Sequence, residues 1–431
     1  MSAQQKISTD VAVVGSGAGG ATVARELSKR DINVVLLERG KAHKWIGSSL
    51  ASLRYIDKGG FLKSEEGLSV IRGITTGGST LIYIGNAFPP PDWLSEEYGI
   101  NLDKEVKETM EELKVQPLPD RFLGEGSRRV MEAANDLGYH WERMLKFVDP
   151  EKCDPNCIDC TFGCKRGAKW TTREYIKEAE ANGARVITSA NVREVMVKDG
   201  RAAGVKAMSS GGPIEIEADK VVLAAGGLGN PMILQRAGIW EAGQGFFCDP
   251  MVMVYGITND VGMKEPLFQL GITEFMESDG FMVATGGGTK SSYLLQLAMK
   301  GIKNIPRVLY FGRTLSLFTK IRDDIDGRVN YDGTFSKPLS YEDRLKLDKG
   351  TALCEKILIK AGADPDTIFF SPLLAAHPGA TARIGKVVDK NLETSIKNLY
   401  VCDVSVMPES LGRPTVLTTI ALAKKFARSI H

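Results

Sequence analysis

The sequence predicts an α/β fold, with a parallel sheet near the N-terminus and at least one further domain. Three observations support this. Residues 10–38 alternate between apolar strand patterns and a helical pattern, joined by a glycine-rich turn. The chain has 431 residues, enough for two or three domains with filled cores. Many of its 46 glycines stand in loops that follow apolar runs, as in α/β proteins whose backbone approaches a nucleotide.

The first strand, turn and helix form a dinucleotide-binding fingerprint. An apolar run at residues 11–14 suits a buried parallel strand, and G-x-G-x-x-G follows it. The first glycine permits the tight turn, the second lets the backbone approach a pyrophosphate, and the third lets the helix pack on the strand. A second strand, NVVLLERG at residues 33–40, contains an acid that can bind ribose hydroxyls. The predicted binding residues are Gly15, Gly17, Gly20, Glu38 and Arg39.

Composition excludes several function classes. Charged residues make up 25% and hydrophobic residues 43%, and the net charge is +2, so neither a nucleic acid nor another polyanion is an expected partner. We see no secretory signal and no run of about 18 apolar residues, and we expect a cytoplasmic protein without a transmembrane helix. Residues 307–321 are apolar and basic; we expect core or pocket wall there, with peripheral membrane contact as the alternative.

The middle of the chain adds antiparallel strands to this frame. Residues 184–208 have strand and hairpin patterns, with a turn signal at Asp199-Gly200. Residues 219–234 then give a buried strand, small residues and a helix. This order resembles a flavin-binding architecture, since a nicotinamide dehydrogenase would continue its βα units directly.

Three further segments carry a family resemblance. Residues 377–427 contain a His-Pro turn, a Val-Val-Asp step, an Asp-x-Ser-x-x-Pro strand end and a Pro-containing helix start. Residues 72–81 carry a Gly-Gly-Ser turn, and residues 163–195 lead into the antiparallel strands. In this order the segments resemble the glucose–methanol–choline (GMC) oxidoreductase family. Two positions depart from its pattern: Ala380-Thr381 stands for Gly-Thr, and Arg413 for Asn.

The resemblance implies a doubly wound, Rossmann-like FAD-binding domain and an α+β substrate domain built on an antiparallel sheet. The FAD domain would cover residues 1–235, with a cysteine-rich loop inserted near residues 150–170. The substrate domain would cover residues 236–372, and residues 373–431 would return to the FAD domain and the active site.

The resemblance also implies bound FAD and assigns positions around it. Val192 would contact the adenine through its backbone. No histidine lies between His43 and His140, so covalent attachment of FAD in the Gly-Gly-Ser segment is not expected. Two further groups would lie along the flavin: Gly77, Gly78, Ser79 and Thr80 on one side, and Asp403, Pro414 and Thr415 on the other.

His377 is the predicted catalytic base, because it lies in the His-Pro turn that the family directs at the flavin and an imidazole suits proton transfer at neutral pH. Arg413 takes the place of the family's second polar group. It stays protonated and cannot be a base, but it could bind an anionic substrate or stabilise a developing negative charge. The alternative is that Arg413 points away in a salt bridge.

Four of the seven cysteines lie within twelve positions, with the spacing C-x3-C-x2-C-x3-C. Thiolates in such a pattern hold an iron–sulfur cluster or a structural zinc ion. A redox flavoprotein favours the cluster, of the [4Fe–4S] type, with zinc and unligated or disulfide-linked thiols as alternatives. The predicted ligands are Cys153, Cys157, Cys160 and Cys164.

The sequence thus predicts an FAD-dependent dehydrogenase that oxidises a CH–OH group of an apolar or anionic small molecule. A cluster would pass electrons to a separate acceptor, either a protein or a quinone. In one alternative, electrons flow the other way and reduce a C=C bond of an apolar or prenyl-like substrate. In another, the chain is an electron-transfer subunit without its own substrate.

Overall fold

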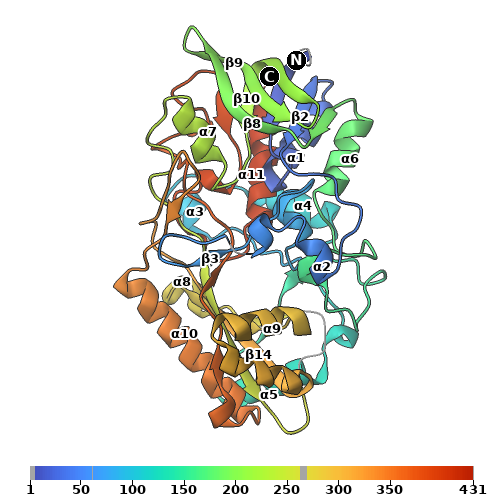
Figure 1. The fold of residues 1–431 in the computed structure, drawn as a ribbon, viewed down its shortest axis with the longest axis vertical. Coiled ribbons are helices and arrows are strands. Elements are labelled where there is room, and N and C mark those ends of the chain that lie inside the picture. The colour runs from blue at the N-terminus through green and yellow to red at the C-terminus, as the bar shows by residue number, and fades with distance from the viewer. Residues whose placement is uncertain (1–4, 61, 263–268, 431) are drawn as a thin grey trace.

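The computed structural model describes residues 5–60, 62–262 and 269–430. Two sheets form the body of the molecule, one above the other in the view of Figure 1. The N-terminal strands and the C-terminal helix belong to the upper part, so the chain returns to the region in which it starts. This arrangement matches the predicted fold class.

The first sheet has seven strands in the order β7-β2-β1-β10-β9-β8, with β19 also paired to β10. Strands β1, β2, β7, β10 and β19 run parallel, whereas β8, β9 and β10 form an antiparallel meander. The predicted turn at Asp199-Gly200 joins β8 to β9, with both residues at positive φ. The strands are β1 (Gln5–Val14), β2 (Val34–Glu38), β7 (Arg185–Thr188), β8 (Asn191–Lys198), β9 (Arg201–Ser209), β10 (Gly212–Leu223) and β19 (Leu399–Val401).

The register of the parallel strands brings their carboxyl ends to one edge. Val14 of β1 is opposite Leu37 of β2 and Leu223 of β10. The turns that follow these strands therefore meet, and such an edge is where open α/β sheets bind ligands. Helix α1 (Ala18–Ser28) begins at this edge and packs between α6 (Arg173–Ala181) and α11 (Val416–Ser429).

The second sheet has eight strands in the order β3-β18-β11-β14-β13-β12-β5, with β17 also paired to β11. All its pairs are antiparallel except β3 with β18. The strands are β3 (Ser69–Val70), β5 (Glu142–Arg143), β11 (Pro250–Ile257), β12 (Leu270–Ile272), β13 (Phe281–Thr285), β14 (Thr314–Ile321), β17 (Phe369–Phe370) and β18 (Leu374–Ala375).

Side chains alternate between the two faces of this sheet, as the pleat of a strand requires. On β14, Leu317 and Ile321 pack under α10 (Tyr341–Lys360), whereas Phe318 and Lys320 point to the other face. Gly350 permits close approach of α10, because a Cβ there would lie 1.9 Å from Thr319 Oγ1. Helix α10 thus covers one face of the second sheet, and the other face is open to the cavity.

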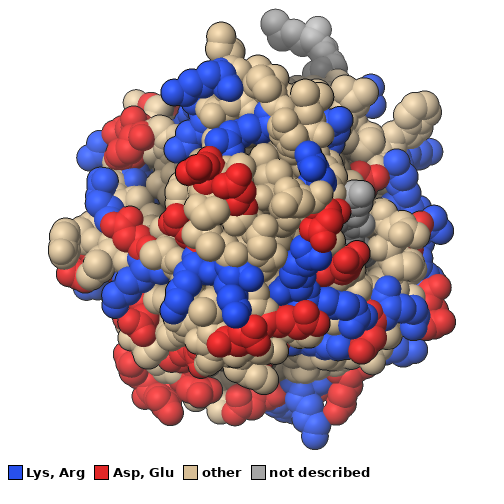
Figure 2. Space-filling model, turned by 90° about the horizontal axis from the view of Figure 1, so that it is seen from below, with Lys and Arg blue, Asp and Glu red and all other residues tan. Residues whose placement is uncertain are grey.

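The remaining helices cover the outside of the molecule. Among the described residues, we find no helix long and apolar enough to cross a membrane. On the face drawn in Figure 2, basic and acidic side chains are interspersed. The remaining α-helices are α2 (Ser49–Ser52), α3 (Trp93–Glu96), α4 (Asp103–Glu112), α5 (Glu125–Asp136), α7 (Asn230–Arg236), α8 (Phe275–Ser278) and α9 (Lys290–Met299).

Short strands and 3₁₀ helices complete the connections. The strands are β4 (Gln116–Pro117), β6 (Leu145–Lys146), β15 (Arg328–Val329) and β16 (Phe335–Ser336). The 3₁₀ helices are η1 (Asp57–Gly60), η2 (Gly78–Leu81), η3 (Asp120–Phe122), η4 (Cys160–Phe162), η5 (Ile302–Arg313), η6 (Pro365–Thr367) and η7 (Val404–Val406).

Candidate active site

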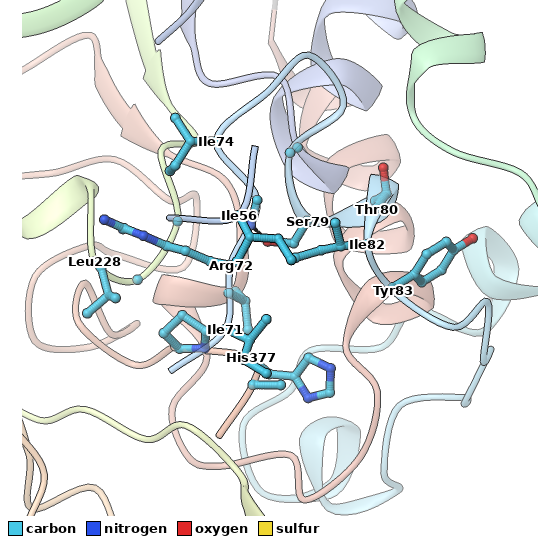
Figure 3. A pocket seen from close by; sticks show the side chains of 18 of the residues that line it. Ile56, Ile71, Arg72, Ile74, Ser79, Thr80, Ile82, Tyr83, Leu228 and His377 are labelled. Atoms are coloured by element: carbon cyan, nitrogen blue, oxygen red, sulfur yellow. Dashed lines mark hydrogen bonds between the residues drawn. The ribbon is translucent and has the colours of Figure 1, made fainter. Parts of the chain in front are cut away.

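A cavity of about 750 Å³ extends between the carboxyl edge of the first sheet and the open face of the second. Figure 3 shows isoleucines 56, 71, 74 and 82 around this space, with His377 beside Ile71. Most of the predicted cofactor residues line it: Gly15, Gly17, Glu38, Arg39, Gly78, Ser79, Thr80, Val192, Asp403, Pro414 and Thr415. Gly20 and Gly77 lie directly behind this wall.

The three fingerprint glycines have the geometry that the sequence predicts. Gly15 has φ +103°, and a Cβ there would lie 2.2 Å from the carbonyl oxygen of Ala224. A Cβ on Gly20 would lie 1.9 Å from the carbonyl oxygen of Gly15, which fixes helix α1 against the strand. Around a Cβ on Gly17, by contrast, the described residues leave open space out to 4 Å. The second glycine therefore faces the cavity.

The Gly-Gly-Ser turn lies directly over this first turn. A Cβ on Gly78 would come 3.0 Å from Gly17 Cα, and the Gly77 amide donates to Ser16 Oγ at 3.0 Å. The Thr172 hydroxyl donates to the carbonyl oxygens of Ser16 and Gly77, each at 3.1 Å. Two glycine turns that are far apart in the sequence thus form one backbone cradle.

Glu38 and Asp403 line the cavity but also hold its walls together. Glu38 accepts from Ser16 Oγ at 2.6 Å and from the Gly40 amide at 2.6 Å. Asp403 accepts from the Gly226 amide at 2.7 Å and from Ser405 Oγ at 2.6 Å. Both carboxylates therefore position backbone at the cavity in addition to any contact with a ligand.

These features fit FAD. An open backbone cradle at Gly17, next to the N-terminus of α1, suits a pyrophosphate. The acid at the end of β2 suits a ribose. The cavity extends from this acid to strands of the second sheet. The residues that would hold the cofactor are those of the two glycine turns, β8 and the start of α11.

His377 lies where this cradle meets the second sheet, and it belongs to a buried charge cluster. Its Nδ1 is 2.9 Å from Asp249 Oδ2, and Lys320 Nζ is 2.9 Å from the same oxygen. Lys320 Nζ is also 3.3 Å from His377 Nδ1. The Asp249 and Lys320 side chains are 0% and 3% exposed, whereas His377 is 24% exposed and lines the cavity.

A second buried ion pair supports the first. Asp323 Oδ2 is 3.1 Å from Lys337 Nζ, and Asp323 Oδ1 accepts from the Asp249 amide at 3.0 Å. Ser410 Oγ is within 3.0 Å of both aspartates. Burial raises the pKa of Asp323 to about 6. We call the set Asp249, Lys320, Asp323, Lys337 and Ser410 the charge cluster.

The charge cluster fixes the protonation of His377. Burial and the Lys320 ammonium lower the pKa of His377 below 6.5, against the opposing effect of Asp249. Burial raises the pKa of Asp249, but Lys320 and His377 outweigh it, and the net shift is downward. The Asp249 carboxylate 2.9 Å from Nδ1 favours a proton on that nitrogen, and the lowered pKa favours the neutral ring, in which Nε2 carries the free lone pair.

Arg413 lies elsewhere. Its guanidinium contacts Glu277, donates to the Pro89 carbonyl oxygen at 3.4 Å, and lines a separate cavity of about 340 Å³. This matches the salt-bridge alternative, and Arg413 is not among the residues that line the large cavity. This position does not support its predicted catalytic role.

The half of the cavity beyond His377 is apolar. Strands β11 and β13 and helix α9 contribute to its wall, and α9 also supplies the polar side chains of Ser291, Ser292 and Gln296. The lining includes Met251, Met253, Met282, Leu295, Met299, Phe318 and Leu374. As expected, part of the segment at 307–321 serves as pocket wall, through Phe318 and Lys320.

The cysteine loop forms another part of the wall, through Thr161 and Phe162. All four cysteines are half-buried free thiols. Among the described residues, no three or more His, Cys, Asp or Glu side chains are arranged to hold a metal ion. The predicted iron–sulfur cluster, and the alternative zinc site, are therefore not supported by the arrangement of the thiols.

Two buried lysines lie beside the loop. Lys169 Nζ donates to the carbonyl oxygens of Cys160 at 2.6 Å and Leu81 at 3.0 Å. Burial lowers the pKa of Lys169 to about 8 and that of Lys146 to about 7, and the nearby thiols oppose both shifts. The loop is thus fixed to the cavity wall by a cation.

The charge cluster was missed by the sequence reasoning. Its signal is visible in retrospect, since Asp249 and Lys320 each interrupt an apolar run, in FFCDPMV and SLFTKI. A charged residue at such a position is buried only when it is paired. Which charges pair with one another depends on the register of β11 with β14.

Comparisons with known proteins identify the family and the fold. GMC oxidoreductase family models match residues 13–251 and 341–423. An uncharacterized protein of Methanocaldococcus jannaschii is 32% identical over 98% of this chain and 99% of its own. A long-chain-alcohol oxidase of Arabidopsis thaliana is 25% identical over 96% of this chain and 66% of its own.

Two solved structures show the same fold. Pyridoxine 4-oxidase from Mesorbium loti superposes with a TM-score of 0.72 at 16% identity, over 97% of this chain and 98% of its own. A variant of Aspergillus oryzae formate oxidase, made to study FAD modification, gives a TM-score of 0.73 at 15% identity, over 99% of this chain and 98% of its own.

Two glycine substitutions should separate cofactor binding from folding. Gly17→Ala puts a methyl group into the open cradle, so we expect FAD affinity to fall by about tenfold or more with an unchanged melting temperature of the apoprotein. Gly20→Ala forces α1 from β1 and should destabilise the apoprotein by about 1–3 kcal/mol. Equal effects of the two substitutions on melting would contradict this assignment.

Removing one charge from the charge cluster should lower the stability of the fold unless its partner is also removed. Asp249→Asn leaves Lys320 buried without its counter-charge, and we expect a loss of about 3–5 kcal/mol in the free energy of unfolding. Adding Lys320→Met to this variant should recover most of the lost free energy of unfolding, as measured by urea denaturation. The exposed pair of Glu194 and Lys206 is the control, and Glu194→Gln should leave stability unchanged.

Proposed function

The chain belongs to the GMC oxidoreductase family, and on this premise we propose that it is an FAD-dependent dehydrogenase that oxidises a CH–OH group. The observation that carries the proposal is the position of His377, held 2.9 Å from Asp249, at the junction of the glycine cradle and the apolar half of the cavity. Bound non-covalently in the cradle, FAD would supply the acceptor for the hydride, which carries the two electrons of the oxidation.

His377 takes the proton of the substrate hydroxyl on Nε2. Its Nδ1–H bond to Asp249 holds the ring in one tautomer and stabilises the imidazolium that forms. Lys320 keeps Asp249 ionised throughout. Because Lys320 offsets the charge of Asp249, the pair adds little net negative charge beside the ring, in keeping with the lowered pKa of His377.

The lining favours an apolar alcohol as substrate. Methionine side chains from β11, β13 and α9 adapt to flexible chains, and the apolar half of the cavity has room for one. Arg413, the group considered for an anionic substrate, does not line this space. The long-chain-alcohol oxidase among the relatives is consistent with this choice.

We retain an iron–sulfur cluster at Cys153, Cys157, Cys160 and Cys164 as a proposal. The cysteine spacing and the place of the loop in the cavity wall support it, whereas the arrangement of the thiols does not. Electrons would leave to a separate protein or quinone. No step of the oxidation by His377 depends on the cluster.

Reduction of a C=C bond in an apolar or prenyl-like substrate is the second candidate, because the apolar lining suits such a molecule equally well. Anaerobic bleaching of the flavin by long-chain alcohols supports oxidation. Bleaching by a chemical reductant alone, followed by reoxidation with an unsaturated lipid, supports reduction. The large lined cavity argues against an electron-transfer subunit without a substrate.

Replacing the base should slow flavin reduction. We expect His377→Ala to lower its anaerobic rate by about 10²–10⁴-fold, the usual contribution of a general base. The exposed His140→Ala is the matched control and should leave the rate unchanged. A loss below threefold for His377→Ala would rule out the role.

The pH profile follows from the lowered pKa of His377. The base works in its neutral form, and its folded pKa lies below 6.5. The rate of flavin reduction should therefore level off at a lower pH than an ordinary imidazole would give, and fall as the pH drops through the folded pKa. A rate that still climbs between pH 7 and 8 would show that another group is the base.

Metal analysis tests the cluster separately from the flavin. After anaerobic purification we expect about four irons with matching sulfide per flavin, and Cys157→Ser should lower iron while FAD is retained. Cys354→Ala, which removes a buried thiol outside the loop, is the control. Flavin without iron in the unaltered chain would remove the cluster from the proposal.

A further inference from the structure

Four large apolar side chains stand out from the surface on two segments. Ile302 is 82% exposed, Trp45 80%, and Leu50 and Leu309 each 79%, the highest values among the large hydrophobic residues that the structure describes. We call residues 41–58 and 290–313 the rim segments. They contain α2 in the first case and α9 with η5 in the second.

Both rim segments border the mouth of the same cavity. Leu53 and Ile56 from the first segment and Leu295 and Met299 from the second line it. Leu53 and Leu295 are themselves 58% and 42% exposed, so the apolar lining continues onto the surface. In Figure 1, α2 and α9 lie on the same side of the molecule, with α2 above α9.

The 3₁₀ helix η5 carries Ile302 and Leu309 and is held against α9. The rings of Tyr293 on α9 and Phe311 on η5 have centroids 5.9 Å apart. Arg307 donates to the Thr367 carbonyl oxygen at 2.7 Å, which fixes the middle of η5. The exposed side chains therefore project from an anchored element.

The rim segments also concentrate positive charge in a chain whose net charge is only +2. The single acid of the first segment, Asp57, is bound to Arg72 at 2.7 Å, and the second segment contains no acid. The basic residues of the rim segments are Lys41, Lys44, Arg54, Lys58, Lys290, Lys300, Lys303, Arg307 and Arg313.

We propose that the rim segments dock on the anionic surface of a lipid bilayer. Trp45, Leu50, Ile302 and Leu309 would enter the headgroup region, and the surrounding lysines and arginines would face lipid phosphates. Charge complementarity and the apolar path from the surface into the cavity favour a bilayer over an acidic protein. An apolar substrate dissolved in the bilayer would then reach His377 without crossing water.

Delivery of an apolar substrate from the bilayer rests on the proposed function, but docking on the bilayer does not. Binding of the FAD-loaded full chain is measured without substrate, by co-sedimentation with vesicles of phosphatidylcholine alone or mixed with phosphatidylglycerol. We expect binding to the mixed vesicles that weakens as salt is added. Failure of vesicle binding would leave the oxidation proposal intact, and failure of flavin reduction would leave docking intact.

Variants locate the binding surface. We expect Trp45→Ser with Leu50→Ser, and separately Ile302→Ser with Leu309→Ser, to lower the partition coefficient by about tenfold or more. Lys300→Glu with Lys303→Glu should lower it by about tenfold or more for mixed vesicles. The control is Trp240→Ser with Tyr341→Ser. These two side chains lie outside the rim segments and are 64% and 76% exposed, and their removal should leave the partition coefficient unchanged.

Melting temperature and FAD content of each variant show whether it is folded. Equal loss of binding in the control pair, or no preference of the unaltered chain for anionic vesicles, would overturn the proposal. If the chain ignores vesicles but its rim segments bind an acidic carrier protein, the surface is a protein interface and the lipid assignment is wrong.

Discussion

The candidate active site depends on a buried pairing of opposite charges. Asp249 precedes β11, Lys320 lies on β14 and His377 lies in the C-terminal return, and one carboxylate oxygen joins all three. Two of these residues hold left-handed backbone, Asp249 at φ +48° and His377 at φ +60°. Such conformations cost free energy in residues other than glycine and persist where surrounding contacts enforce them.

The same pairing sets the chemistry on both sides of His377. Toward the first sheet, two glycine turns leave backbone exposed for a cofactor, because a side chain at Gly17 would enter the open space and one at Gly78 would press on Gly17. Toward the second sheet, strand alternation turns methionines inward while α10 covers the opposite face. The imidazole stands between a polar cradle and an apolar pocket, and its neighbours keep it neutral.

Much of this was predictable from local sequence. The fingerprint at Gly15, Gly17 and Gly20 determines a local turn, so its geometry follows from residue type and spacing alone. His377 could be predicted to line the cavity because its turn is also local. The charge cluster could not be found in this way, since its partners come from segments paired only by the folded register of β11 and β14. Arg413 shows the limit of local motifs. Its place in the motif predicted a role beside the flavin, but its guanidinium binds Glu277.

The tautomer of His377 is the most direct test of the account. The chain has four histidines, so a ¹⁵N-histidine spectrum of the FAD-loaded protein is simple to assign with His377→Gln. We predict a neutral ring with its proton on Nδ1 at pH 7, and loss of that signal pattern in Asp249→Asn. A proton on Nε2 alone, or an imidazolium at pH 7, would contradict the assignment of His377 as a base oriented by Asp249 and Lys320.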